Sequence, residues 1–279
     1  MGDVAGYETL LLRQLLEKVS CDGGYDFRDY KRSTVNRRLA RRLRAVGAGT
    51  YREYMQFLDA CPEEYHKLAE EITIKVSGFF RAPYCFEQVA KLVLPEIIVA
   101  KKARGERELR FWSTACARGE EPYSLAILLN EFLGQQRQEL FISIQATDIS
   151  RWALRQAEAG VYSMKDLETL PRRILDEYFV PRQEGYGVID NIRNMVSFAH
   201  FDLTSAGKPP FTGVDCVFCC NVLIYLQRQL QERLLNMLYD ALVDRGYLVL
   251  GEMETPTGSL LKRLECLDSK AKIYQKVTN

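Results

Sequence analysis

The sequence predicts an α/β fold with a mostly parallel sheet, preceded by a small all-α unit. Two observations carry this prediction. Short apolar runs with strand character, at 109–113, 141–146 and 214–225, alternate with longer runs of helical spacing, a pattern that favours parallel strands with crossover helices. Residues 1–75 instead consist of successive segments with helical spacing. We therefore expect two domains, at 1–75 and 76–279.

Several helices are expected in the N-terminal part, and one of them is strongly basic. They cover 7–20, a segment capped by Ser33 or Thr34 and ended by Gly47–Gly49, then 51–61 and 63–76. In the basic helix, apolar residues recur every four positions, as expected for one buried face. The charged positions of that helix are Arg37, Arg38, Arg41, Arg42 and Arg44.

Arginines four residues apart repel one another by a few tenths of a kcal/mol per pair, so this basic cluster needs an explanation. One explanation is a solvated face balanced by acids elsewhere in the fold. Another is a docking face for an acidic partner. Nucleic acid is the weaker possibility, because no aromatic residues are interleaved with the arginines and the whole chain has a net charge of only +1.

The stretch 109–148 has the order strand, loop, helix, strand and contains two acids at its key positions. Glu121 lies in the helix opening that follows the first loop, and Asp148 follows the second strand. Ligands of open α/β sheets bind at the carboxyl ends of the strands, where Asp148 is placed to accept hydrogen bonds from a ribose diol. A helix cap is an equally good interpretation of Asp148 alone. Gly119 is the single glycine of the loop, which favours a nucleoside ligand without a pyrophosphate.

Composition excludes several functional classes. Eight cysteines are scattered, several of them within apolar runs, which is typical of reduced cytosolic thiols. With two histidines and no second Cys-x-x-Cys pair, we expect no metal site and no histidine-dependent nucleophilic catalysis. No apolar run has the roughly 18 residues that a membrane helix needs. The N-terminus has no signal-peptide pattern, so a cytoplasmic protein without membrane insertion is expected.

The rest of the chain continues the alternation. A helix that tolerates Pro95 is expected at 84–100, and another follows Asp148 at 150–160. Alternating runs at 186–198 suggest a hairpin or a small subdomain, placed at about 180–200. Later elements are strands ending near 201–203 and at 214–225, a helix at 227–242, and strands at 246–251 and 271–276.

Seven segments together resemble the CheR family of chemotaxis receptor (protein-glutamate) O-methyltransferases, and they run in that family's order. They are Lys31-Arg32-Ser-Thr-Val-Asn-Arg37-Arg38-Leu, Phe79-Phe80-Arg81, Ala115-Cys-Ala-Arg-Gly-Glu-Glu-Pro-Tyr-Ser124, Ala146-Thr-Asp148-Ile, Gly160-Val-Tyr162, Phe201-Asp-Leu203 and Cys219-Cys-Asn-Val-Leu-Ile-Tyr225. The resemblance implies a Rossmann-like S-adenosylmethionine-dependent methyltransferase sheet with a small inserted β subdomain, preceded by an all-α N-terminal domain. The implied cofactor is S-adenosyl-L-methionine, with S-adenosyl-L-homocysteine as the product.

The resemblance also assigns site residues, position by position. Asp148 matches the ribose-binding acid and Glu121 a cofactor-binding acid of the first loop. Lys75 and Ser77 stand where the family more usually has Asn and Thr, and Cys220 stands where Arg is common. The other implied cofactor contacts are Arg81, Asp202, Leu203, Asn221 and Val222. Arg81 and Tyr225 match the residues expected nearest the transferred methyl group, and are the implied catalytic residues.

The implied acceptor is a glutamate carboxylate of a chemotaxis receptor, in its cytoplasmic helical domain. A carboxylate with a reference pKa near 4.3 is already ionised at pH 7, so the reaction needs no general base. The resemblance implies that the basic helix contacts the acidic helices of the receptor. The hypothetical docking face consists of Arg37, Arg38, Arg41, Arg42 and Arg44. We expect a monomer. The alternative is a scaffold or sensor that keeps the fold and the cofactor without methylating receptors.

Overall fold

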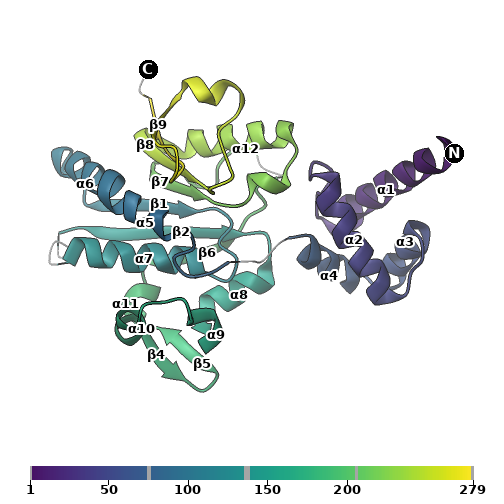
Figure 1. The fold of residues 1–279 in the computed structure, drawn as a ribbon, viewed down its shortest axis with the longest axis horizontal. Helices are drawn as coiled ribbons and strands as arrows, with labels where there is room; N and C mark the ends of the chain where they lie inside the picture. The colour runs from purple at the N-terminus through teal and green to yellow at the C-terminus, as the bar shows by residue number, and fades with distance from the viewer. Residues whose placement is uncertain (1, 74–76, 135–138, 205–206, 278–279) are drawn as a thin grey trace. The chain divides into compact units, whose positions relative to one another are not determined.

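The structure is a computed structural model that describes residues 2–73, 77–134, 139–204 and 207–277 (Figure 1). The chain divides into two compact units. One comprises Met1–Ile74 and Tyr225–Leu230, and the other comprises Lys75–Ile224 and Gln231–Asn279. The short segment 225–230 therefore packs with the N-terminal helices, although the residues on both sides of it belong to the second unit.

The first unit is all α-helical. Its helices are α1 (Gly2–Gly23), α2 (Arg32–Val46), α3 (Tyr51–Ala60) and α4 (Glu63–Ile72). Buried side chains from all four helices form one core, including Leu15, Leu39, Leu58 and Leu68. Segment 225–230 joins this unit through backbone hydrogen bonds: the amide of Lys31 donates to the carbonyl of Tyr225 at 2.8 Å.

The start of α2 differs from the prediction, whereas its end agrees with it. The helix begins one residue before Ser33, and the residue preceding it is Lys31, whose side chain makes no capping hydrogen bond. Ser33 and Thr34 are therefore first-turn residues and not caps; Thr34 is buried there. At the other end Gly47 adopts φ +74°, a left-handed conformation that glycine enters without steric cost.

The second unit is built on a seven-stranded sheet with the order β6-β2-β1-β7-β8-β10-β9. The strands are β1 (Glu108–Ser113), β2 (Phe141–Asp148), β6 (Val196–His200), β7 (Val214–Cys219), β8 (Leu242–Leu250), β9 (Leu264–Asp268) and β10 (Ile273–Lys276). The strands from β6 to β8 pair in parallel, and β10 pairs antiparallel with both β8 and β9. The predicted mostly parallel sheet is confirmed. The edge strand β9 was not predicted.

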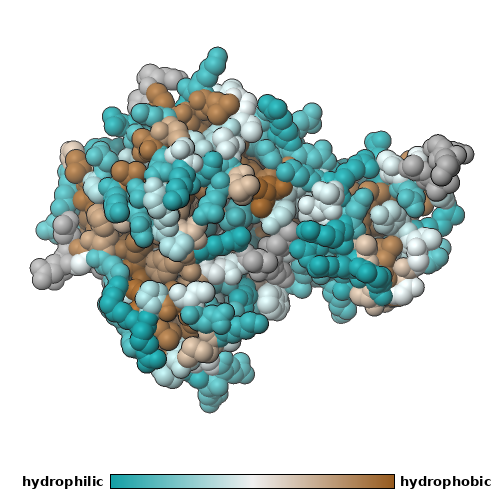
Figure 2. Space-filling model, viewed as in Figure 1, coloured by the Kyte–Doolittle hydropathy of each residue, from teal (hydrophilic) through white to brown (hydrophobic). Residues whose placement is uncertain are grey.

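Helices complete this unit. They are α5 (Pro83–Gln88), α6 (Leu94–Ala103), α7 (Glu120–Leu133), α8 (Arg151–Ala159), α12 (Arg228–Ala241), the shorter α9 (Met164–Leu167), α10 (Arg172–Tyr178) and α11 (Asp190–Arg193), and the 3-10 helices η3 (Leu223–Tyr225) and η4 (Gly258–Lys262). Figure 1 shows α7 and α8 along one side of the sheet and α12 on the other. Hydrophobic residues show at the surface around α5 and α7 (Figure 2). Most of α7 is buried, as its almost wholly apolar sequence predicted.

The helix predicted at 84–100 is continuous but irregular. Between α5 and α6 the residues Val89–Val93 form a π-helical turn, in which the amide of Leu94 donates to the carbonyl of Val89. Pro95 follows directly and has no amide hydrogen to donate. The wider π turn therefore lets the helix pass through the proline without ending.

A second, three-stranded sheet has the order β3-β5-β4. Its strands are β3 (Val161–Tyr162), β4 (Phe179–Arg182) and β5 (Gly185–Val188). The alternating runs of 186–198 do not form one hairpin, because Gly185–Val188 pairs with β4 whereas Val196–His200 pairs in parallel with β2. The small β subdomain thus draws its strands from 161–188, earlier in the chain than the expected 180–200.

Candidate active site

The carboxyl ends of β1, β2, β6 and β7 lie at one edge of the main sheet, because these strands are parallel. The loops that leave this edge carry most of the residues that the sequence assigned to the cofactor. Six non-glycine residues of the described chain have positive φ, and four of them are in or next to these loops: Phe80, Ala82, Ala117 and Asn221. Backbone strain of this kind costs free energy and concentrates at functional sites.

Asp148 joins two of the loops. One carboxylate oxygen accepts a hydrogen bond from the amide of Ala117 at 2.9 Å, and the other accepts from the amide of Ser150 at 2.8 Å. Ser150 itself caps α8, accepting from the amide of Ala153. Asp148 is therefore not the cap of this helix. Its carbonyl accepts from the amide of Phe201, which brings the loop after β6 alongside.

Glu121 lies in the first turn of α7, and its carboxylate is compensated mainly by uncharged groups. The Ser113 hydroxyl donates to it at 2.7 Å. Burial raises the pKa of Glu121 to about 7, and hydrogen bonds from Ser113 and Cys220 and the charge of Arg81 offset only part of that rise. The carboxylate therefore takes a proton readily in this structure, and a positive charge placed beside it would favour its ionised form.

Gly119 explains why the loop before α7 holds a glycine. It adopts φ +93°, and a Cβ there would lie 3.0 Å from both the Ala157 Cβ and the Tyr162 hydroxyl oxygen. The Tyr162 hydroxyl also donates to the Arg118 carbonyl at 2.7 Å, and the Arg118 guanidinium pairs with Asp166 of α9. The small β subdomain is thus bonded directly to this loop.

The segment before α5 carries Ser77 and Arg81. The ring of Phe79 packs edge-on against Tyr162 and Phe179 of the small subdomain, at centroid distances of 4.8 and 5.2 Å. The amide of Phe80 donates to the Ser124 hydroxyl at 2.8 Å, so both phenylalanines fix the path of the chain. Arg81 is exposed and its charge reaches Glu121. Lys75 lies outside the described residues.

The remaining predicted contacts follow β6 and β7. Asp202 accepts hydrogen bonds from the amide and the hydroxyl of Thr204, and both Asp202 and Leu203 are partly buried. Asn221 and Val222 are also partly buried, and Asn221 has φ +61°. Tyr225 ends η3 and belongs with the all-α unit. Its catalytic role stays a prediction.

Glu254 was missed by the sequence reasoning. Its buried carboxylate accepts hydrogen bonds from the amides of Asn221 at 2.9 Å, Gly251 at 2.8 Å and Ile224 at 3.2 Å. The available signal was an acid three residues after Gly251, where the predicted strand ended. Acids in such loops are common, so the pattern alone did not distinguish this residue.

The arginines of α2 separate into two groups. Arg42 makes two 2.8 Å hydrogen bonds to the buried carboxylate of Glu64, which also accepts from Tyr54, and Arg38 pairs with Glu71. These two are part of the helical packing, because acids of α4 balance them. Arg37, Arg41 and Arg44 are exposed on the outer face of α2, where Arg41 shares Glu71. Of the five arginines predicted as a docking face, only Arg37, Arg41 and Arg44 remain candidates for contact with a partner.

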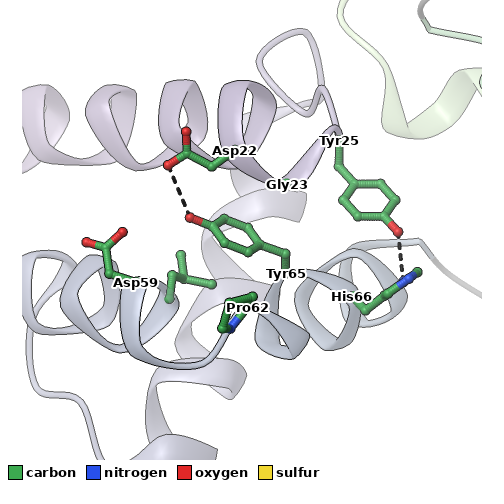
Figure 3. Close-up of a pocket in the computed structure, with 8 residues that line it drawn as sticks. Asp22, Gly23, Tyr25, Asp59, Pro62, Tyr65 and His66 are labelled. Atoms are coloured by element: carbon green, nitrogen blue, oxygen red, sulfur yellow. Dashed lines mark hydrogen bonds between the residues drawn. The ribbon is translucent and has the colours of Figure 1, made fainter.

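The all-α unit also contains a hollow of about 330 Å³ between α1, α3 and α4. In Figure 3 the hydroxyl of Tyr25 bonds to the His66 ring and that of Tyr65 points at Asp22. Asp22 and Asp59 both pair with Lys18. None of the predicted site residues lines this hollow, and we assign it no role.

The sequence predicted neither a metal site nor a membrane-spanning helix. Within ranges 2–73, 77–134, 139–204 and 207–277, no group of three or more His, Cys, Asp or Glu side chains is placed to hold a metal ion. In the same ranges, no helix combines the length and the apolar character needed to cross a bilayer.

Comparisons with known proteins agree with this architecture. The family model described as CheR methyltransferase, SAM binding domain, matches residues 75–273, and the model described as CheR methyltransferase, all-alpha domain, matches residues 11–73. The chain is 32% identical to Chemotaxis protein methyltransferase 2 of Pseudomonas aeruginosa, with 87% of this chain and 85% of that protein covered. It is 32% identical to Putative methyltransferase Cher3 of Pseudomonas putida, with 95% and 96% covered.

One relative is much longer than this chain. The chain is 35% identical to an uncharacterized 104.1 kDa protein of Rhodobacter capsulatus, over 87% of its own length but only 25% of that protein. The match over both parts of the chain confirms the resemblance that the motifs indicated. The chain belongs to the CheR methyltransferase family and is a methyltransferase that uses S-adenosylmethionine.

Proposed function

We propose that this enzyme transfers the methyl group of S-adenosylmethionine to glutamate side-chain carboxylates of chemotaxis receptors, forming glutamyl methyl esters in sensory adaptation. The supporting relatives are those that carry the name chemotaxis protein methyltransferase. The observation in the structure that carries the proposal is the site edge itself, which gathers four acids: Glu121, Asp148, Asp202 and Glu254.

The residues at this edge fit the cofactor by their chemistry. The partly buried carboxylate of Glu121 lacks a full compensating charge, as its raised pKa indicates. It would be stabilised by the ammonium group of the cofactor's amino-acid part or by the sulfonium. Asp148 uses each carboxylate oxygen for one backbone hydrogen bond. A carboxylate oxygen can accept a second bond, so Asp148 can still bind a ribose diol. When bound, the cofactor supplies the activated methyl group.

The acceptor carboxylate needs alignment more than activation. It is ionised at pH 7, and its negative charge is cancelled as the methyl is transferred from a positive sulfur. A strong cationic clamp on the acceptor would therefore stabilise the ground state more than the transition state. Orientation of the reactants in a dry pocket can supply up to roughly 7–11 kcal/mol. On this basis Arg81 orients the cofactor, with Ser77 and Lys75 nearby in the sequence, and Tyr225 supplies a hydroxyl or a ring wall.

The all-α unit is proposed as the receptor-docking domain. Its exposed arginines Arg37, Arg41 and Arg44 suit the acidic helices of a receptor's cytoplasmic domain, whereas Arg38 and Arg42 hold α2 to α4. We place the enzyme in the cytoplasm and expect it to act as a monomer.

The test is incubation of the purified enzyme with S-adenosyl-[methyl-³H]methionine and a receptor cytoplasmic fragment. Glutamyl methyl esters release volatile methanol in alkali, so base-labile tritium in the receptor band is the expected result. A receptor fragment whose acceptor glutamates are replaced by alanine is the control. Cofactor binding without base-labile label would reject receptor methylation.

A second candidate is a scaffold or sensor that binds the cofactor without methylating receptors. One observation favours it: Cys220, whose thiol donates to the Val249 carbonyl at 3.9 Å, stands where the family commonly has arginine, and a thiol is a weaker donor than a guanidinium. The same labelling assay decides between the candidates, because a scaffold would bind S-adenosylmethionine and leave the receptor unlabelled.

A further inference from the structure

Glu254 connects two loops at the carboxyl edge of the sheet. Its Oε2 accepts from the amides of Asn221 and Gly251, at 2.9 and 2.8 Å, and its Oε1 accepts from the amide of Ile224 at 3.2 Å. The residue is 3% exposed. One carboxylate thereby fixes the loop after β7 to the loop after β8, a role that only a side chain with two acceptor oxygens can fill.

The contact requires a close approach of the two loops. A Cβ on Gly251 would lie 2.7 Å from the amide nitrogen of Asn221 and 2.7 Å from Oε2 of Glu254. Real Cβ atoms do not come so near, so any larger residue at position 251 would push the loops apart. Asn221 also has φ +61°, a conformation that persists only where its surroundings hold it.

The carboxylate of Glu254 is held by neutral backbone donors in place of a cation. Three amides converge on it, two of them from the residues on either side of Val222 and Leu223. The carboxylate also holds the start of η3, because it accepts from the amides of Asn221 and Ile224 in the way that a capping carboxylate satisfies the free amides at a helix start. The position of Asn221 and Val222 therefore depends on a residue more than 30 positions later in the chain.

We infer that Glu254 is a positioning residue of the methyltransferase site, which sets the loop of Asn221 and Val222 against the cofactor without touching the cofactor itself. The inference rests on the proposed assignment of Asn221 and Val222 as cofactor contacts. It does not depend on the identity of the methyl acceptor, because its test measures cofactor binding alone.

The experiment compares Glu254→Gln with Asp215→Asn in the full chain. Asp215 is also a buried carboxylate that accepts a backbone amide, but it lies at the amino end of β7. Glutamine keeps the size of Glu254 but has one acceptor oxygen, so one or more amides lose their partner. We expect Glu254→Gln to raise the Kd for S-adenosylhomocysteine roughly tenfold or more in calorimetric titration, as expected when a buried donor is left unsatisfied. Asp215→Asn should lower the melting temperature yet leave that Kd within about twofold.

Two further variants keep the inference open to refutation. Gly251→Ala retains the carboxylate but separates the loops, and should weaken S-adenosylhomocysteine binding in the same way, even if Glu254→Gln fails to fold. Asn221→Ala tests the underlying assignment. If Asn221→Ala leaves the Kd unchanged, the assignment and the inference both fall. If Asn221→Ala weakens binding while Glu254→Gln and Gly251→Ala change the Kd no more than Asp215→Asn does, Glu254 is only structural.

Discussion

Acidic side chains at the two ends of β7 have different partners: a cation at the amino end and mainly neutral donors at the carboxyl end. At the amino end, Asp215 pairs with the buried ammonium of Lys101 at 3.0 Å. At the carboxyl end, Glu121 accepts from the Ser113 hydroxyl and Glu254 accepts from three backbone amides. Burial raises the pKa of all three carboxyl groups, so the two ends differ in the partners and not in the direction of the shift. A carboxylate matched with a cation serves the fold. The amides around Glu254 hold the loops in place, whereas the carboxylate of Glu121 would be further stabilised by a positively charged group of a ligand.

Left-handed backbone conformations are more frequent at the carboxyl edge than at the amino end of the sheet. The loops at the carboxyl edge contain Ala117 and Asn221 in left-handed conformations, whereas in the described chain Arg245 and Lys272 are the other such residues outside the site segments. These left-handed conformations lower the stability of the site loops. One such residue also occurs at the amino end of the sheet, Arg245 in β8. The comparison predicts that substitutions at the amino end change folding and that those at the carboxyl end change binding.

The largest effect is expected from Lys101→Met, which leaves Asp215 charged and buried without its partner. Removing one member of a buried pair typically destabilises a protein by about 3–5 kcal/mol, and urea unfolding should show a loss of that size. The Kd for S-adenosylhomocysteine should be unchanged where the protein is folded. Lys102→Met is the matched control, because Lys102 is half exposed and 3.9 Å from its partner Glu139; a loss below about 1 kcal/mol is expected. Equal losses of stability in Lys101→Met and Lys102→Met would show that the buried ion pair at the amino end has no special role in folding.

Next in size is Asp148→Ala. It removes the carboxylate that bonds Ala117 and Ser150 and that we propose to bind the ribose. Hydrogen bonds to charged groups contribute about 1.5–3 kcal/mol, so the Kd for S-adenosylmethionine should rise about 10- to 150-fold in calorimetric titration. Asp176→Ala, at an exposed acid of α10, should leave the Kd unchanged. Wild-type affinity in Asp148→Ala would remove Asp148 from the site.

A smaller effect should appear in the pH dependence of cofactor binding. Since the pKa of Glu121 is about 7 in the structure and 4.5 is its ordinary value, its contribution to stability is present below pH 4.5 and is lost as the pH rises through 7. A cationic ligand reverses this preference by binding the ionised form. Affinity should therefore rise with pH between about 6 and 7.5, by at most about tenfold per pH unit. The α-amino group of the ligand stays protonated over this range, because its pKa is about 7.7–8.0.

Glu121→Gln is the check on this pH dependence. The variant has no ionisable group at this position, so its affinity for S-adenosylhomocysteine should vary little between pH 6 and 7.5. Calorimetry at three pH values, corrected for buffer ionisation, should also detect proton release on binding to the wild type at pH 6.5 and none with the variant. A slope that persists in Glu121→Gln would assign the titration to another group.

Sequence reasoning succeeded where a property depends on neighbours along the chain. The almost wholly apolar sequence of α7, the strand–loop–helix unit around Glu121 and the end of α2 at Gly47 are all local features. It failed where partners are remote. Nothing near Glu254 in the sequence indicates that it bonds Asn221, 33 residues earlier. The strand β9 has little alternation of its own and is specified by its antiparallel pairing with β10.

The arginines of α2 also have partners that are remote in the sequence and could not be predicted from it. From spacing alone all five arginines of α2 were equivalent, but Glu64 and Glu71 come from α4, and only the fold shows that they engage Arg42 and Arg38. The charge-reversal variant Arg37→Glu/Arg44→Glu should therefore raise the KM for a receptor fragment several-fold at low salt and less at 0.5 M, where surface charges are screened. Its kcat and its Kd for S-adenosylmethionine should stay constant.

The matched control for this smallest effect is Arg13→Glu, at an exposed position of α1 in the same unit. It changes the net charge in the same sense but lies off α2, so a general electrostatic attraction would raise the receptor KM in both proteins. A local docking face would raise it in the α2 variant alone. Arg42→Ala should act differently again, lowering the melting temperature because Glu64 is left buried without its guanidinium. An unchanged receptor KM in Arg37→Glu/Arg44→Glu would place receptor docking elsewhere.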